Sequence, residues 1–231
     1  MFQTYGIDIL SFTLSALLLA SYYLFLARKL RRYPTYTIQA INNIARKAWV
    51  ESIMRDKGKE VLAVQTLRNS IMAATLPATS SVVLIIGVLT LSAQGDKMES
   101  IWHVLNFLGV THSDLWLTKL LILLLDLLVA FFSFSMSIRF YNHVGFMVNV
   151  PLSYKHETLQ PEHVAVHLNR AGRFYSVGMR AYYFAVPLVF WLFGPHFMLM
   201  ATIALVFALY RLDRAPRIIP DSGNDRPRAG A

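Results

Sequence analysis

The stretch LWLTKLLILLLDLLVAFFSFSMSI, residues 115–138, decides the fold of this chain. Nearly every side chain in it is apolar, and only Lys119 and Asp126 carry a charge. At about 1.5 Å per residue in an α-helix, the stretch is longer than the roughly 30 Å hydrocarbon core of a bilayer. We therefore expect it to form a membrane-spanning helix.

Four further apolar runs accompany it, at residues 7–27, 69–93, 174–193 and 196–212. With 55% hydrophobic residues in a chain of 231, the composition is that of one compact helical membrane domain. The expected fold is an all-α integral membrane protein with about five transmembrane helices over residues 1–215, followed by a flexible cytoplasmic tail, 216–231. The last run is short for a span, so a re-entrant hairpin of the last two runs is the alternative.

Positive charge falls on one side of this topology. Of the 22 Lys and Arg residues, all but Lys97 and Lys119 lie in segments that alternating spans place on the same side. Because positively charged segments stay in the cytoplasm during insertion, we expect the N-terminus outside and the C-terminus in the cytoplasm. The net charge of +9 then suits the anionic cytoplasmic leaflet rather than nucleic acid, and the simplest location is the inner membrane of a bacterium.

Two cytoplasmic segments are predicted to form amphipathic helices. From Thr37 to Ile53, apolar residues recur every three to four positions while the other face is basic. Such a helix, which carries Trp49, either lies among the lipid headgroups or packs on the bundle. A second helix is expected to begin near Pro161, a residue type favoured in the first turn, and to continue into the fourth span.

Asp126 is the main candidate for a functional residue, because a charge in mid-bilayer is costly. Counted from the outer face, Asp126 lies about 17 Å deep and Arg180 about 20 Å deep at the rise of an α-helix. We therefore expect a hydrogen-bonded Asp126–Arg180 pair. Together with Ser133, Ser137 and Arg173, these residues would form a polar seam between the third and fourth spans. A structural ion pair is favoured over the alternatives, which are a proton or ion path and a buried ligand site.

Metal and cofactor chemistry have weak support. Cysteine is absent from the sequence, which excludes disulfides and thiolate metal sites. His163 and His167 are four positions apart, on one face of a helix, and His143 would complete a candidate metal site. The first four spans contain no histidine, which argues against a haem within the bilayer. We expect no cofactor, and the sequence does not favour an enzyme.

Three stretches carry a family resemblance: Trp49 with Met54, residues 68–75 (RNSIMAAT) and residues 173–185 (RFYSVGMRAYYFA). They resemble an uncharacterised membrane-protein family catalogued as domain of unknown function 599, which is found in bacteria and plants. The resemblance covers about residues 5–213. It implies a multi-helix membrane protein and supplies no known activity and no catalytic residues.

From these observations we expect a non-catalytic accessory or structural subunit that binds other membrane proteins through its apolar and aromatic faces. One alternative is a small transporter or channel that uses the Asp126/Arg180 seam. The other is a membrane enzyme with a metal held on the cytoplasmic side by His143, His163 and His167. The subunit hypothesis comes first because the positive signals for chemistry are thin.

Overall fold

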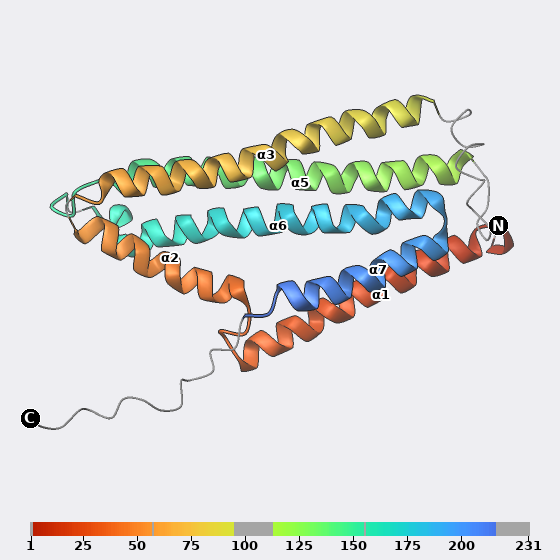
Figure 1. The fold of residues 1–231 in the computed structure, drawn as a ribbon, viewed down its shortest axis with the longest axis horizontal. Coiled ribbons are helices and arrows are strands. Elements are labelled where there is room, and N and C mark those ends of the chain that lie inside the picture. Colours follow the sequence, from red (N-terminus) through yellow and green to blue (C-terminus); the bar gives the residue numbers. More distant parts are fainter. Residues whose placement is uncertain (1, 57, 95–112, 155, 216–231) are drawn as a thin grey trace, which may run out of the picture.

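The computed structural model describes residues 2–56, 58–94, 113–154 and 156–215 (Figure 1). The regular elements in these ranges are α1 (Phe2–Arg32), α2 (Ile38–Arg55), α3 (Glu60–Ala93), α5 (Ser113–Met147), α6 (Pro161–Phe193) and α7 (Pro195–Leu212), with a 3₁₀ helix at Glu157–Leu159. An isolated β-bridge joins Thr37 to Arg214. The predictions for Lys97 and for the tail, 216–231, lie outside the described residues.

Five of these helices are long and apolar enough to cross a membrane. They are Gly6–Arg32, Glu60–Ala93, Asp114–Met147, Pro161–Phe193 and Pro195–Leu212. The prediction of an all-helical fold with five apolar helices is therefore confirmed, and it is consistent with an integral membrane protein. The helices α6 and α7 meet at Gly194, whose φ of 151° lies where glycine is strongly favoured.

The long helices extend beyond the apolar runs that predicted them. The helix α3 already begins at Glu60, and α5 continues to Met147. Arg139, where the apolar run ends, is exposed, while Phe140 and Val144 just beyond it are buried. A helix continues past such a charge when the opposite face of the same turns can still pack.

The five long helices form a row in which neighbours pack in the order α3, α5, α6, α7 and α1, and α2 packs across α6. In Figure 1, α3, α5 and α6 run on past the level where α1 and α7 end, and α2 lies over this extension. The predicted amphipathic helix is therefore α2. Its Val50 and Ile53 are buried, while Ile38, Ile41 and Ile44 stay exposed.

Apolar clusters follow one another along the row. One contains Leu123, Leu188 and Trp191, a second contains Phe134 with Ala130 and Ala181, and a third near α2 contains Val50, Leu67, Val144 and Leu168. In the second cluster the ring of Phe134 lies directly against the backbone of α6 at Gly178. A Cβ atom at Gly178 would come within 2.8 Å of that ring, so the close contact between α5 and α6 depends on glycine.

Gly178→Ala is expected to destabilise the protein by about 1–3 kcal/mol, because the added methyl group would overlap the buried ring of Phe134. Gly87→Ala is the control, since nothing lies within 4 Å of a Cβ atom there. Alanine's higher helix propensity should leave the stability of that variant equal or slightly raised. Thermal unfolding in mild detergent measures both, and equal melting temperatures would contradict the tight α5–α6 contact.

Candidate functional site

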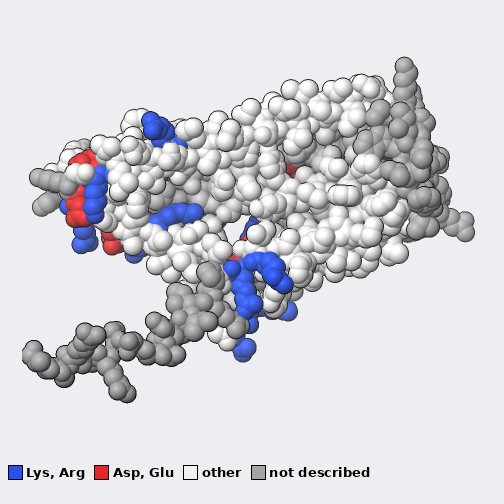
Figure 2. All heavy atoms as spheres, in the orientation of Figure 1, with Lys and Arg blue, Asp and Glu red and all other residues white. Residues whose placement is uncertain are grey.

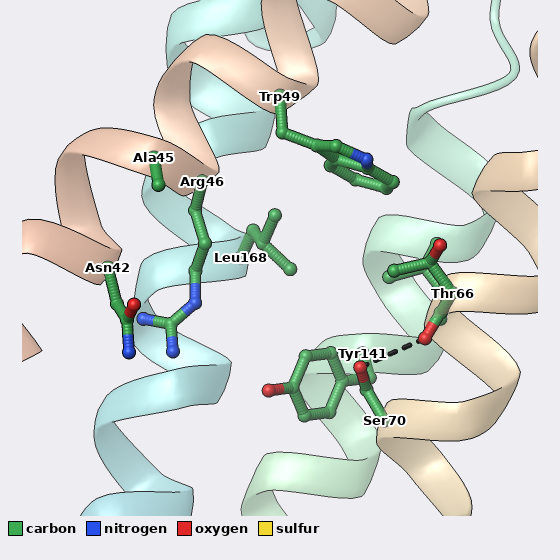
Figure 3. A pocket seen from close by; sticks show the side chains of 9 residues that line it. Asn42, Ala45, Arg46, Trp49, Thr66, Ser70, Tyr141 and Leu168 are labelled. Atoms are coloured by element: carbon green, nitrogen blue, oxygen red, sulfur yellow. Dashed lines mark hydrogen bonds between the residues drawn. The ribbon is translucent and has the colours of Figure 1, made fainter.

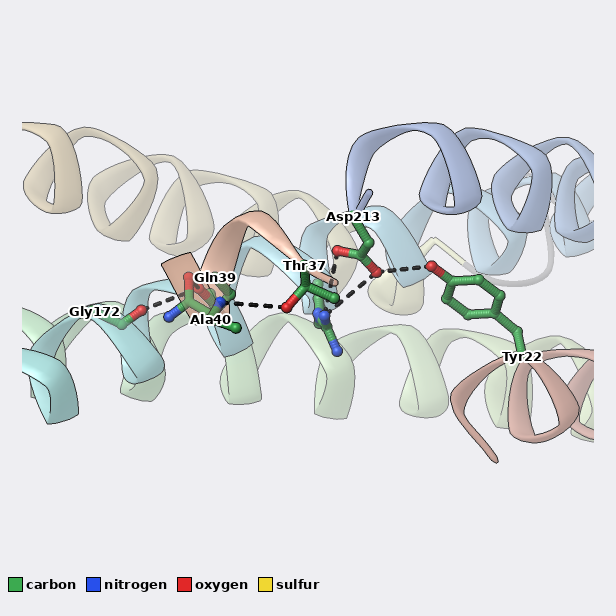
Figure 4. Close-up of polar contacts among 8 residues, drawn as sticks. Tyr22, Thr37, Gln39, Ala40, Gly172 and Asp213 are labelled. Carbon is green, nitrogen blue, oxygen red and sulfur yellow. Dashed lines mark hydrogen bonds and ion pairs between the residues drawn. The ribbon is translucent and has the colours of Figure 1, made fainter. Parts of the chain in front are cut away.

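Asp213, directly after α7, contacts side chains from two other helices (Figure 4). The Nη2 atom of Arg180 on α6 lies 3.4 Å from each carboxylate oxygen, and the hydroxyl of Tyr22 on α1 donates to Oδ2 at 2.8 Å. The Arg180 guanidinium also lies over the ring of Tyr23, 5.1 Å from its centre. We call Asp213, Arg180, Tyr22 and Tyr23 the Asp213 cluster. It joins α1, α6 and the end of α7.

The backbone around Asp213 holds this cluster in place. The carbonyl of Asp213 accepts a hydrogen bond from the N–H of Ile38 at 3.2 Å, and the N–H of Ala215 donates to the carbonyl of Tyr36 at 3.0 Å. Between them, Thr37 is buried and its hydroxyl caps the first turn of α2. The end of α7 and the start of α2 are thus fixed to each other.

A cavity of about 250 Å³ lies beside the cluster, between α2, α6 and α7. The hydroxyl of Ser176, in its lining, lies 3.1 Å from Oε1 of Gln39 and 3.0 Å from the carbonyl oxygen of Gly172. Because Asp213 offsets the charge of Arg180, this arrangement is suited to fastening four helices together rather than to holding a charged ligand.

The predicted Asp126–Arg180 pair is wrong. Arg180 pairs with Asp213, and the Oδ2 atom of Asp126 is buried without a hydrogen-bond partner among the described residues. The side of α6 that meets α5 is marked by Gly178, which touches Phe134. Each residue turns the helix by roughly 100°, so Arg180, two residues further on, points to nearly the opposite side of α6. The prediction compared how deep Asp126 and Arg180 lie along their helices, but it did not consider which way each side chain points.

The remaining seam residues lie in different surroundings. Ser137 is buried and donates to the carbonyl of Ala171 at 2.9 Å, across the α5–α6 contact. Ser133 is also buried, one turn away on the same face of α5, whereas Arg173 is exposed. The two serines thus belong to helix packing, while Arg173 and Arg180 lie elsewhere.

A buried ion pair near the α6–α7 turn escaped the sequence analysis. Nζ of Lys119 on α5 lies 3.0 Å from Oδ1 of Asp8 on α1, with only 5% and 1% of the two side chains exposed. The same carboxylate oxygen accepts a hydrogen bond from Nε1 of Trp191 on α6 at 2.9 Å. Asp8 lies at the start of the run 7–27 and Lys119 near the start of the run 115–138, so two opposite charges were expected near the same side of the membrane. That match was the available signal for the contact.

The candidate metal ligands do not assemble. The rings of His143 and His167 both lie beside Phe140, with their centres 6.5 and 6.1 Å, respectively, from the centre of the Phe140 ring. The side chain of His163 is exposed. Within the described ranges, no group of three or more His, Asp or Glu side chains is placed to hold a metal ion. The geometry therefore gives the predicted histidine site no support. Helical spacing placed two of these residues on one face but did not provide a third ligand.

A double-mutant cycle on thermal stability distinguishes the two carboxylates as partners of Arg180. Arg180→Gln and Asp213→Asn should each destabilise the protein by about 1–2 kcal/mol, and the double variant should lose less than the sum. The matched cycle of Arg180→Gln with Asp126→Asn should be additive within about 0.5 kcal/mol. A larger coupling of Arg180 with Asp126 than with Asp213 would refute this assignment.

Comparisons with known proteins agree with the sequence resemblance. No curated protein and no solved structure matches the chain. A family model described as "Protein of unknown function, DUF599" matches residues 10–218, which is most of its length. The match confirms the resemblance to this family that the sequence analysis stated. The chain therefore belongs to the DUF599 family of proteins of unknown function.

Proposed function

We propose that this protein is a non-catalytic component of a membrane assembly, which binds another membrane protein along the outward face of α3. The observation that carries the proposal is the pattern of small residues on that face. Ala73, Ser80 and Gly87 are all exposed and recur at intervals of seven residues, within one apolar span. Residues seven apart return to the same side of a helix, so the three form a continuous strip.

The position of α3 leaves this strip accessible. The helix lies at one end of the row and packs on α5. Pro77 stands inside α3, and Figure 1 shows the helix bending near its middle. Nothing lies within 4 Å of a Cβ atom at Gly87, so a second helix could come close to the backbone there.

A surface that meets only lipid has no need of small side chains. Lipid tails fill space around residues of any size, whereas small residues let two helix backbones approach and gain van der Waals contact. The hydroxyls on this side of α3 are satisfied within the helix: Ser80 donates to the carbonyl of Leu76 at 3.0 Å, and Thr79 to that of Thr75 at 3.1 Å. The face can therefore insert into lipid first and bind a protein afterwards.

Transport along the predicted seam is a weaker candidate. Arg180 is paired with Asp213, and Ser137 donates to the Ala171 carbonyl in a packed helix contact. Two of the polar groups that would have formed one path, Arg180 and Ser137, are thus engaged in separate structural contacts. The accessory role needs only the exposed face of α3, so we place it first.

The test is purification of the tagged protein from native membranes in a mild non-ionic detergent, followed by native mass measurement. We expect a complex with a foreign subunit, which Ser80→Leu and Gly87→Leu should dissociate because the larger side chains block close helix approach. Ala20→Leu, the same kind of change at an exposed position of α1, should leave the complex intact.

Two outcomes would contradict the proposal. One is a monomer in native extracts, and the other is a complex that survives both α3 substitutions. An assembly of identical chains that these substitutions dissociate would keep the binding face but replace the foreign partner by a second copy.

The orientation follows from charge. Figure 2 shows Lys and Arg gathered over the end of the molecule where α2 lies and around the ends of α1 and α7. Arg28, Lys29, Arg31 and Arg32 close α1, and Arg211 lies in the last turn of α7. We therefore place this end in the cytoplasm, beside an anionic leaflet, with the inner membrane of a bacterium as the expected location.

Fusing a reporter that is active only in the cytoplasm, such as a fluorescent protein, after Ala231 checks this orientation. A bright fusion is expected. Replacing the four basic residues at the end of α1 by glutamine should lower the correctly oriented fraction, because these charges hold that end inside. A dark fusion that becomes active with an exported enzyme as reporter would reverse the topology.

A further inference from the structure

A cavity of about 440 Å³ lies where α2 covers α3, α5 and α6, apart from the Asp213 cluster. Figure 3 shows side chains from these helices around one space, with the guanidinium of Arg46 and the hydroxyl of Tyr141 both facing it. The lining residues that matter for binding are Asn42, Arg46, Trp49, Leu67, Tyr141 and Leu168. The lining thus combines a cation, hydroxyl and amide groups, and apolar side chains.

The charge of Arg46 is not offset in this cavity. No carboxylate among the described residues forms an ion pair with it, and its Nη1 atom donates instead to the neutral Oδ1 of Asn43 at 3.2 Å. The guanidinium rests on α6: a Cβ atom at Gly172 would lie only 2.4 Å from its central carbon. Glycine at this position therefore makes room for the cation, which is half-buried rather than extended into solvent.

The position along α6 places the cation at headgroup depth. Gly172 precedes Phe193, the last residue of α6, by a length of about 32 Å at 1.5 Å per residue. With Phe193 at the outer edge of a hydrocarbon core roughly 30 Å thick, and with the orientation proposed above, Arg46 lies just past the cytoplasmic edge. This is the level at which the phosphate groups of lipids stand.

We propose that this cavity binds a phosphate ester, with the guanidinium of Arg46 as the cationic anchor. A planar guanidinium offers paired N–H donors that match phosphate oxygens. The hydroxyl of Tyr141 and the amide of Asn42 stand around the same space as further donors, whereas the hydroxyl of Ser70 already donates to the carbonyl of Thr66 at 2.9 Å. The ester is either the headgroup of an anionic phospholipid or a soluble organic phosphate.

The apolar part of the lining fits the organic portion of such an ester. Trp49, Leu67 and Leu168 line the same cavity, and Leu67 and Leu168 belong to the buried cluster between α2, α3, α5 and α6. A bare inorganic ion would leave these surfaces unused. A phospholipid would place its glycerol backbone against them while its phosphate meets Arg46.

The test uses the full-length protein, purified in an uncharged detergent and delipidated. Three probes are titrated by native mass measurement and thermal shift: phosphatidylglycerol, diacylglycerol with the same acyl chains, and glycerol 3-phosphate. Diacylglycerol lacks only the phosphate headgroup, so it isolates the contribution of the anion. Glycerol 3-phosphate carries the phosphate without the acyl chains, so it identifies a soluble source.

Arg46→Gln should weaken binding of the phosphate-bearing probe by about tenfold or more, since it removes a charged hydrogen-bond donor. Lys47→Gln, the next residue on α2, removes one positive charge outside the cavity and should change affinity less than about twofold. Gly172→Ala keeps the charge but displaces the guanidinium, so it should also weaken binding. This second variant decides the matter if Arg46→Gln fails to fold, which circular dichroism would reveal.

Every result bears on the proposal. Binding of phosphatidylglycerol that depends on Arg46 supports it with a lipid as the source, and Arg46-dependent binding of glycerol 3-phosphate supports it with a soluble source. Equal affinity in the wild-type protein and both cavity variants would overturn it. So would diacylglycerol binding as tightly as phosphatidylglycerol, or the absence of binding by all three probes.

Discussion

The contacts of Asp213 determine how the rest of the molecule is arranged. Its carboxylate receives Arg180 from α6 and Tyr22 from α1, while its carbonyl accepts the N–H of Ile38 at the start of α2. One residue thus holds the pair α1–α7 against α6 and also fixes where α2 begins. Both charged side chains are partly buried, so leaving either one without its partner would destabilise the protein.

The course of α2 follows from this starting point. From Ile38 the helix crosses α6, and its second half buries Val50 and Ile53. That path brings Arg46 onto Gly172, where a larger residue would not fit. The cavity around Arg46 therefore depends on two features far apart in the sequence: the contacts that position α2 and the glycine that receives its arginine.

The helices could be predicted from the sequence because apolar runs and prolines act locally. The runs located the five apolar helices, and Pro161 marked the start of α6. The helix ends were less accurate, since Arg139 stopped the apolar run but not the helix. Tertiary packing buries Phe140 just beyond that charge, and a pattern read along one helix does not contain its neighbours.

The polar contacts were harder to predict, for a geometrical reason. The depth of a residue along a helix follows from counting residues. Which partner its side chain meets depends on the helix that lies on that side, and the sequence of one helix does not show this. The sequence analysis therefore paired Arg180 with Asp126 instead of Asp213, and it did not predict the Asp8–Lys119 pair. The basic face predicted for residues 37–53 gave no sign of the Arg46 cavity, because that cavity exists only once α2 is in position.

The distance in sequence between Tyr22 and Asp213, 191 positions, has a consequence for biogenesis. The ribosome delivers α1 and α2 long before Asp213 is made, so the fastening of α2 cannot form during most of synthesis. Until Asp213 is made, the N–H of Ile38 lacks its carbonyl partner, and the first turn of α2 is held to α6 by the contact of Gln39 with Ser176. The start of α2 therefore gains its last backbone contact only after α7, the final helix of the row, has been made.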